Sequence, residues 1–499
     1  MSGQAGSLGT AAASVPGLGG RALSLGAANA FEFALQFLLP VVLVRCLDTE
    51  AFGQYRLLWL AVATIVGLGA LDMPASLYYF LPRSGTDAKR LYINQTLAFL
   101  AFAGLVAGWA VSSWNPWLPG KLRVLAAHDA VVPAFVLMWM VASLLDLLPT
   151  AEERVAWQAK AKVGLAAVRA AALSVAAVLT QSLEALLLVL LGFALLKLAL
   201  LIGYVARHHG LRGPIARRHA FSDQLRYALP LGLASALYGL RVQADQWVAA
   251  ALFPLGMFAS FSIGAALAPL LALIRQSTNG VFMPSMSRLQ AAGDIRAMLA
   301  LNSRANVMVS ALVLPLLAFG FTFAPELIRL VYTPAYLDAV PVMRIFNVGL
   351  AALVLELASL TMLLRQVVFV MVLNAVMVVV SVVLDWTAAL HFGLAGAAAG
   401  SVVTIYLDRI VTLRRISRHT GVPLRRLQDW GALGRLALFA VLAAALAWTL
   451  VGRYIGADGP LPRLAAGGTA FACAYVALMA SFNPGREWLA AWRARRRER

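Results

Sequence analysis

The sequence predicts an all-α polytopic membrane protein with fourteen transmembrane helices. Of its 499 residues, 61% are hydrophobic and only 13% are charged, and the mean hydropathy is +0.80. Soluble domains are usually about 45–50% apolar and about 25% charged. Runs of mostly apolar residues recur along the chain, each near the roughly 20 residues that a membrane helix needs. This composition excludes a soluble enzyme, a nucleic-acid-binding protein and a disordered protein.

The predicted spans follow one another with short connections. They cover residues 22–45, 57–80, 91–113, 130–150, 164–181, 184–206, 227–249, 251–275, 305–330, 339–362, 366–389, 393–413, 434–453 and 464–483. No connection is long enough to hold a catalytic domain, and no phosphate-binding loop follows the glycine-rich pattern of nucleotide hydrolases. We therefore expect no enzymatic activity.

The distribution of basic residues sets the predicted orientation. With the N-terminus in the cytoplasm, and with residues near the span ends counted with the adjoining segment, the inside segments carry 30 Lys or Arg and the outside segments carry seven. Cytoplasmic loops accumulate Lys and Arg, so both termini are predicted to be cytoplasmic. Residues 1–21 are predicted to be a flexible cytoplasmic N-terminus, and we expect no signal peptide there. The tail, 484–499, combines Trp488 and Trp492 with a run of Arg, which predicts binding to anionic membrane lipids.

Two pairs of landmarks indicate an internal repeat. Phe52-Gly53-Gln54-Tyr55 after the first span matches Leu255-Gly256-Met257-Phe258 after the seventh, and Phe80-Leu81-Pro82-Arg83 matches Phe282-Met283-Pro284-Ser285. The two offsets are nearly equal, which predicts a parallel pseudo-repeat of two six-helix lobes. The lobes are 22–206 and 227–413, joined by a basic cytoplasmic linker, 207–226. Two further helices follow within 434–483.

Five motifs resemble the polysaccharide-biosynthesis flippases of the MATE/MOP exporter superfamily. They are Arg45-x-Leu47-x-x-x-x-Phe52-Gly53-x-Tyr55, then Phe80-Leu81-Pro82-Arg83, Pro284-x-x-Ser287-x-Leu289-x-x-x-Gly293-Asp294, Tyr336-x-x-Ala339 and Gly393-x-x-Gly396-Ala397-Ala398-x-Gly400-Ser401. The resemblance runs from about residue 22 to 413. The family usually has Gly where Asp48 stands here.

The resemblance implies a transporter of the bacterial inner membrane. Such proteins flip polyprenyl-pyrophosphate-linked oligosaccharides for O-antigen, capsule or exopolysaccharide synthesis, by alternating access of two lobes around a central cavity. It implies no cofactor beyond a coupling H⁺ or Na⁺, and polysaccharide polymerase and glycosyltransferases as further partners. Two alternatives stay open, namely a multidrug or cation antiporter of the same superfamily and a non-transport role such as a scaffold or glycan ligase.

Polar residues within the spans are the predicted site, because ionisable groups in a membrane usually face a cavity. Asn29, Glu32 and Gln36 share one face of the first span, and Tyr238, Arg241 and Asp245 share one face of the seventh. The residues predicted to bind substrate are Arg241, Arg45, Arg275, Asn29, Gln36 and Tyr238, and those predicted to couple an ion are Glu32, Asp72 and Asp245.

Arginine suits a pyrophosphate because its planar guanidinium gives bidentate hydrogen bonds. At rest, Arg241 is predicted to pair with Asp245 one turn away. Such cations favour an anionic substrate, whereas an antiporter for organic cations would prefer an acidic cavity. The other intramembrane charges, which are weaker candidates, are Arg169, Lys197, Arg344, Glu356 and Asp385.

Overall fold

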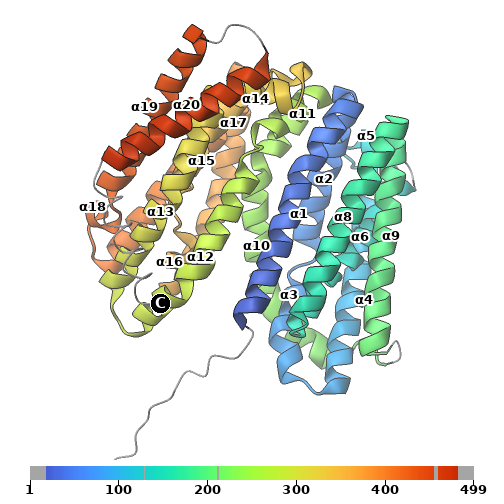
Figure 1. Ribbon diagram of the computed structural model, residues 1–499. Helices are drawn as coiled ribbons and strands as arrows, with labels where there is room; N and C mark the ends of the chain where they lie inside the picture. The colour runs from blue at the N-terminus through green and yellow to red at the C-terminus, as the bar shows by residue number, and fades with distance from the viewer. Residues whose placement is uncertain (1–17, 129, 211–212, 455–458, 482–499) are drawn as a thin grey trace, which may run out of the picture.

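The computed structural model describes residues 18–128, 130–210, 213–454 and 459–481. Within these ranges all regular structure is helical, which confirms the predicted fold class. Figure 1 shows two groups of helices side by side, an N-terminal bundle (α1–α9) and a C-terminal bundle (α10–α20), with α10 and α11 between them. The predicted membrane-binding tail with Trp488 and Trp492, and residues 1–17 of the predicted flexible N-terminus, lie outside the described residues.

The N-terminal bundle consists of α1 (Leu18–Cys46), α2 (Thr49–Gly69), α3 (Met73–Phe80), α4 (Thr86–Ala110), α5 (Arg123–Ala126), α6 (Val131–Ala142), α7 (Leu148–Ala151), α8 (Val155–Thr180) and α9 (Leu183–His208). The C-terminal bundle consists of α10 (Arg218–Leu252), α11 (Leu255–Gly264), α12 (Ala268–Ala291), α13 (Ile295–Thr322), α14 (Ala324–Val331), α15 (Ala339–Ala352), α16 (Ala358–Leu363), α17 (Val367–Thr420), α18 (Leu424–Leu427), α19 (Trp430–Tyr454) and α20 (Pro460–Ser481).

Helical residues underlie all fourteen predicted spans. Eleven described helices are long and apolar enough to cross a membrane, so the protein is a multi-pass membrane protein. Several spans are broken: α2 and α3 form one, α11 and α12 another, and α15 and α16 a third. α10 begins at Arg218, inside the segment predicted to be a linker, so half of that segment is helical.

α17 contains two predicted spans that turn back on each other at Gly393, whose φ is 62°. The two halves pack closely because glycines replace side chains where they meet. A Cβ at Gly396 would lie 2.0 Å from the carbonyl oxygen of Ala388, and one at Gly400 would lie 2.5 Å from Asp385 Oδ1. The Gly396-x-x-x-Gly400 motif therefore positions Asp385 against the second half of the hairpin.

The landmarks of the predicted repeat face each other across the two bundles. A Cβ at Gly53 would lie 2.2 Å from the carbonyl oxygen of Leu255, and one at Gly256 would lie 3.1 Å from Thr49 Oγ1. The N-terminal parts of α2 and α11 can approach this closely because glycine stands at 53, where a Cβ would overlap backbone, while a Cβ at 256 would be a tight contact with a side chain.

α10 connects the two bundles. Its first half packs on the N-terminal bundle, where buried Gln224 donates hydrogen bonds to Ser76 Oγ (2.8 Å) and Thr96 Oγ1 (2.9 Å). Nearby, a Cβ at Gly232 would collide with Leu71 at the break between α2 and α3. Its second half packs along α17. One continuous helix thus carries polar residues from one bundle to the other.

A buried polar cluster closes one end of the N-terminal bundle, just beyond α7. Glu152 Oε1 lies 2.5 Å from His209 Nε2, and Tyr204 donates a hydrogen bond to Glu152 Oε2. Burial acts to raise the pKa of Glu152, but hydrogen bonds from His209 and Tyr204, with the nearby positive charges, outweigh it and leave the pKa below its ordinary value.

α19 and α20 pack on α13 and α14 at the side of the C-terminal bundle (Figure 1). Phe323 fills the centre of this contact against small residues of α19, and Gly467 of α20 leaves room for its ring. Arg463 of α20 pairs with buried Glu326 at 3.3 Å.

Candidate functional site

A cavity of about 470 Å³ lies between the two bundles. Helices α1, α2 and α8 line one side of it, and α10, α11 and α12 line the other. Its polar lining residues are Gln36, Tyr55, Arg56, Trp59, Arg169, Gln246, Ser262 and Tyr332. A site lined from both bundles is the arrangement that alternating access requires.

Two arginines give this cavity its charge. Arg56 Nε donates a hydrogen bond to Ser262 Oγ at 3.1 Å, which links α2 to α11. The guanidinium of Arg169 lies over the Trp59 ring, 5.9 Å from its centroid. Among the described residues, neither arginine has a carboxylate within salt-bridge distance. The cavity between the bundles is therefore cationic.

A second cavity, of about 390 Å³, lies in the C-terminal bundle and shares Gln246, Ala265 and Ala268 with the first. The arginines in it are paired with carboxylates. Arg241 Nη1 lies 3.3 Å from Asp408 Oδ1, and Arg409 Nε lies 3.7 Å from Asp408 Oδ2. One buried carboxylate thus serves two guanidinium groups, one from α10 and one from its own helix, α17.

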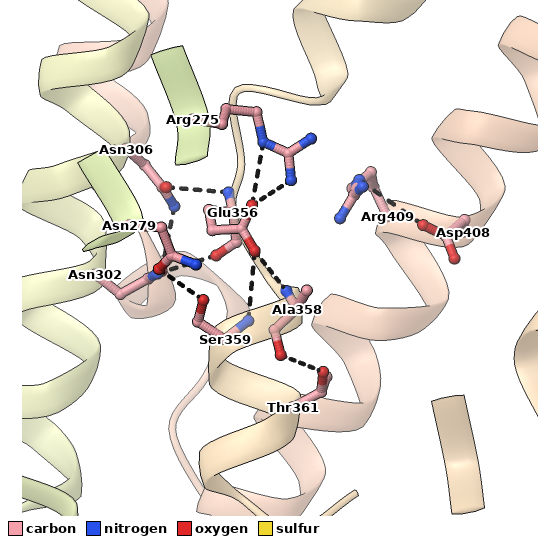
Figure 2. Close-up of polar contacts among 10 residues, drawn as sticks. All are labelled: Arg275, Asn279, Asn302, Asn306, Glu356, Ala358, Ser359, Thr361, Asp408 and Arg409. Carbon is pink, nitrogen blue, oxygen red and sulfur yellow. Dashed lines mark hydrogen bonds and ion pairs between the residues drawn. The ribbon is translucent and has the colours of Figure 1, made fainter. Parts of the chain in front are cut away.

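Figure 2 shows a polar network where α15 gives way to α16. Arg275 of α12 donates two hydrogen bonds to Glu356 Oε2, one from Nε at 3.1 Å and a shorter one from Nη2. Asn306 accepts from the backbone N–H of Glu356 at 3.0 Å, and Asn302 donates to its carbonyl at 2.9 Å. These two asparagines satisfy backbone groups that the helix break leaves unpaired, as non-helical backbone within a membrane requires.

Two further carboxylates meet where α10 crosses α17. Asp385 is fully buried and accepts hydrogen bonds from Ser381 (2.8 Å) and Ser401 (3.1 Å). Ser401 also contacts Asp245 on α10. In the part of the chain that the structure describes, neither carboxylate has an ion pair with Lys, Arg or His. Asp245 lines the second cavity and Asp385 lies behind the lining residues Ser381 and Ser401, so this edge of the cavity is the part best suited to a cation.

The sequence from the second half of α1 to the start of α15 matches a known family. The family model described as "Polysaccharide biosynthesis protein" matches residues 42–341, which is more than half of the chain. The chain belongs to this polysaccharide biosynthesis family. No curated protein sequence matches it.

Solved structures of transporters share the fold of this polysaccharide biosynthesis protein. The inward closed conformation of the lipid II flippase MurJ aligns with a TM-score of 0.69 and 12% identity, over 94% of this chain and 100% of that one. An inward-facing multidrug resistance MATE family transporter of the MOP superfamily aligns with a TM-score of 0.58 and 13% identity, over 78% and 96%. A MOP superfamily transporter from Pyrococcus furiosus aligns with a TM-score of 0.52 and 14% identity, over 80% and 96%.

The structure brings five of the predicted site residues of this family member to the cavities. Gln36 lines the cavity between the bundles, and Tyr238, Arg241, Asp245 and Arg275 line the second cavity. The predicted pairing of Arg241 with Asp245 is wrong, because Arg241 pairs with Asp408. Their spacing places both side chains on one face of α10, but α17 packs along that face and offers a carboxylate closer to the guanidinium.

The remaining predicted residues lie outside both cavities. Lys162 of α8 pairs with Glu32 at 3.0 Å and donates to Asn29 Oδ1 at 2.8 Å, so these two residues connect α1 to α8. Arg45 is exposed and donates a hydrogen bond to the carbonyl oxygen of Leu330, in the last turn of α14. Asp72 accepts a hydrogen bond from Ser235 (2.6 Å) at the break between α2 and α3.

The predicted site residues did not include Arg56, Asp408 and Arg409. The second span is predicted to begin at 57, which places Arg56 in the outside segment before it, whereas α2 begins at Thr49. Arg409 was counted among the cytoplasmic residues, although it lies inside the predicted span 393–413. The available signal was the adjacent pair Asp408-Arg409 within an apolar run, since charges in a span mark a cavity or a partner.

Proposed function

We propose that this protein flips a polyprenyl-pyrophosphate-linked oligosaccharide across the bacterial inner membrane by alternating access of its two bundles. The observation that carries the proposal is the unpaired charge of Arg56 and Arg169 in the cavity between the bundles. An unpaired cation is unfavourable in a poorly solvated site, and a diphosphate supplies the missing negative charge with bidentate hydrogen bonds. Membership of a polysaccharide biosynthesis family supports the same substrate class.

Neutralising these arginines tests the proposal. Arg56→Gln and Arg169→Gln should each lower glycan export at least about tenfold, because a charge-assisted hydrogen bond contributes about 1.5–3 kcal/mol. The lipid-linked intermediate should accumulate on the cytoplasmic side, and Arg→Lys at either position should restore only part of the activity. Arg453→Gln, which changes an exposed arginine at the end of α19 outside the cavities, is the matched control. Normal export by both cavity variants at normal membrane levels would refute the role.

The alternative is a cation antiporter of the same superfamily, which the unpaired carboxylates Asp245 and Asp385 favour. The two functions differ in the charge of the transported molecule. In proteoliposomes, the flippase should translocate a fluorescent polyprenyl-pyrophosphate oligosaccharide and leave ethidium unmoved. The opposite result would assign the antiporter function.

We also propose that Asp245 and Asp385 bind the coupling ion, H⁺ or Na⁺. Two neighbouring carboxylates without a counter-cation repel each other at low dielectric, so binding a cation stabilises the contact between α10 and α17. Asp385→Asn should remove the dependence of flipping on imposed Na⁺ or proton gradients. Glu32→Gln should keep that dependence, because Glu32 is already paired with Lys162. The reverse outcome would move coupling to Glu32.

We further propose that both termini are cytoplasmic and that the protein works beside the glycosyltransferases and polymerase that make and use its substrate. The excess of Arg and Lys on one side of the predicted spans supports this orientation. Single cysteines placed in 414–433 should react with a membrane-impermeant thiol reagent only after the membrane is opened. Labelling of this segment from outside would invert the orientation.

A further inference from the structure

A groove of about 690 Å³ runs between α13, α15, α17 and α19, on the C-terminal bundle and separate from both cavities. Apolar side chains make most of its wall, and Phe321, Val348 and Val441 in that wall are exposed at the protein surface. The groove therefore opens towards the lipid that surrounds the bundle.

Two polar side chains of α15 stand in this apolar wall. Arg344 donates from Nε to the carbonyl oxygen of Phe321 at 3.1 Å and has no carboxylate partner among the described residues. Asn347 is 3% exposed, and neither its amide nitrogen nor its amide oxygen has a hydrogen-bond partner in the described part of the chain. A buried amide left unpaired is unfavourable by about 1–3 kcal/mol, so the groove is incomplete without a polar ligand.

The positions of Arg344, Asn347 and the apolar wall along the membrane normal match the order of phosphate, ester and acyl chain in a glycerophospholipid. Arg344 lies five residues after the start of α15, near the end of the bundle that is predicted to face outside. Asn347 lies about 4.5 Å deeper, at 1.5 Å per residue. The groove wall then continues along α19 from Trp448 to Ala437, about 17 Å at the same rise. That length is close to one leaflet, half of a hydrocarbon core of about 30 Å.

We propose that this groove binds a glycerophospholipid of the outer leaflet, with its phosphate on Arg344, an ester carbonyl at Asn347 and an acyl chain along α19. The unpaired amide of Asn347 favours a glycerophospholipid over a polyprenyl lipid. A glycerophospholipid carries ester carbonyls one turn below its phosphate, where Asn347 stands, whereas a polyprenyl chain has only hydrocarbon there and leaves the amide unpaired. The site is thus distinct from the one proposed for the transported substrate.

Native mass spectrometry of the purified full-length protein, titrated with phosphatidylglycerol, tests the proposal. The wild type should hold one phosphatidylglycerol that Arg344→Gln binds at least about tenfold more weakly, since a charge-assisted hydrogen bond is lost. Asn347→Leu, which keeps the side-chain volume, should weaken binding roughly two- to tenfold. Arg453→Gln, at an exposed arginine at the end of α19 outside the groove, should bind as the wild type does.

A second arm changes the lipid and compares the wild type with Asn347→Leu. An ether-linked analogue of phosphatidylglycerol lacks the ester carbonyls, so the wild type should bind it more weakly than the ester lipid, whereas Asn347→Leu should bind the two equally. Equal binding of ester and ether lipids by the wild type would overturn the proposal. So would displacement of phosphatidylglycerol by polyprenyl phosphate at equal concentration, which would assign the groove to the transported substrate.

Discussion

Asp408→Asn should destabilise the protein more than Arg241→Gln, although the two residues form one ion pair. Asp408 contacts two guanidinium groups, Arg241 at 3.3 Å and Arg409 at 3.7 Å, and its side chain is only 9% exposed. Removing it leaves both arginines without an anion. Removing Arg241 instead leaves Asp408 with Arg409.

The magnitudes follow from that asymmetry. Breaking a buried ion pair so that a charge remains unpaired lowers stability by about 3–5 kcal/mol, which we expect for Asp408→Asn. For Arg241→Gln we expect a smaller loss, about 1.5–3 kcal/mol, which is the range for an interaction with a charged group, because Arg409 still neutralises the carboxylate. The double variant should show a coupling energy of about 0.5–3 kcal/mol.

The free energy of unfolding of the purified protein, measured by titration with sodium dodecyl sulfate, checks these values. Arg453→Gln, at an exposed position outside the cavities, serves as the control and should change stability by no more than about 0.5 kcal/mol. An Arg241→Gln variant as unstable as Asp408→Asn would contradict the reasoning, as would additive effects in the double variant. Either result would mean that Asp408 does not hold the two arginines together.

Three further outcomes are expected. Gly396→Ala should lower stability by about 1–3 kcal/mol, because the added Cβ would overlap a backbone carbonyl. Gly434→Ala, where the added Cβ meets open space, should raise stability by up to about 1 kcal/mol. Equal shifts in melting temperature for the two variants would argue against close packing in the α17 hairpin. Asn306→Leu should cost about 1–3 kcal/mol by unpairing the backbone at the α15–α16 break, and an unchanged melting temperature would count against that role. The pKa of Glu152 is lowered in the folded protein, so its contribution to stability should be present above about pH 4.5 and should fall as the pH drops below that value. Glu152→Gln should therefore weaken the pH dependence of stability below about pH 4.5. A pH dependence identical to that of the wild type would exclude the effect.

Composition and hydrophobic length were enough to determine the architecture of this protein. A chain that is 61% hydrophobic can satisfy its backbone in lipid only as helices or as a closed barrel, and runs near 20 residues select helices. The break between the predicted spans 366–389 and 393–413 coincides with the turn at Gly393, because such a break is a local requirement set by residues a few positions apart.

Partners across helices could not be predicted, because they depend on how helices separated by many residues pack. The spacing of Arg241 and Asp245 correctly placed both on one face of α10, yet α17 brings Asp408 to that face from 167 positions away. Similarly, Lys162 precedes the predicted span 164–181, but α8 begins earlier, at Val155, and packs this lysine beside Glu32. Hydrophobicity determines which segments enter the membrane, but only tertiary packing determines which buried charges neutralise one another. Because packing gives Arg56 and Arg169 no carboxylate partner among the described residues, these two arginines give the cavity between the bundles its positive charge.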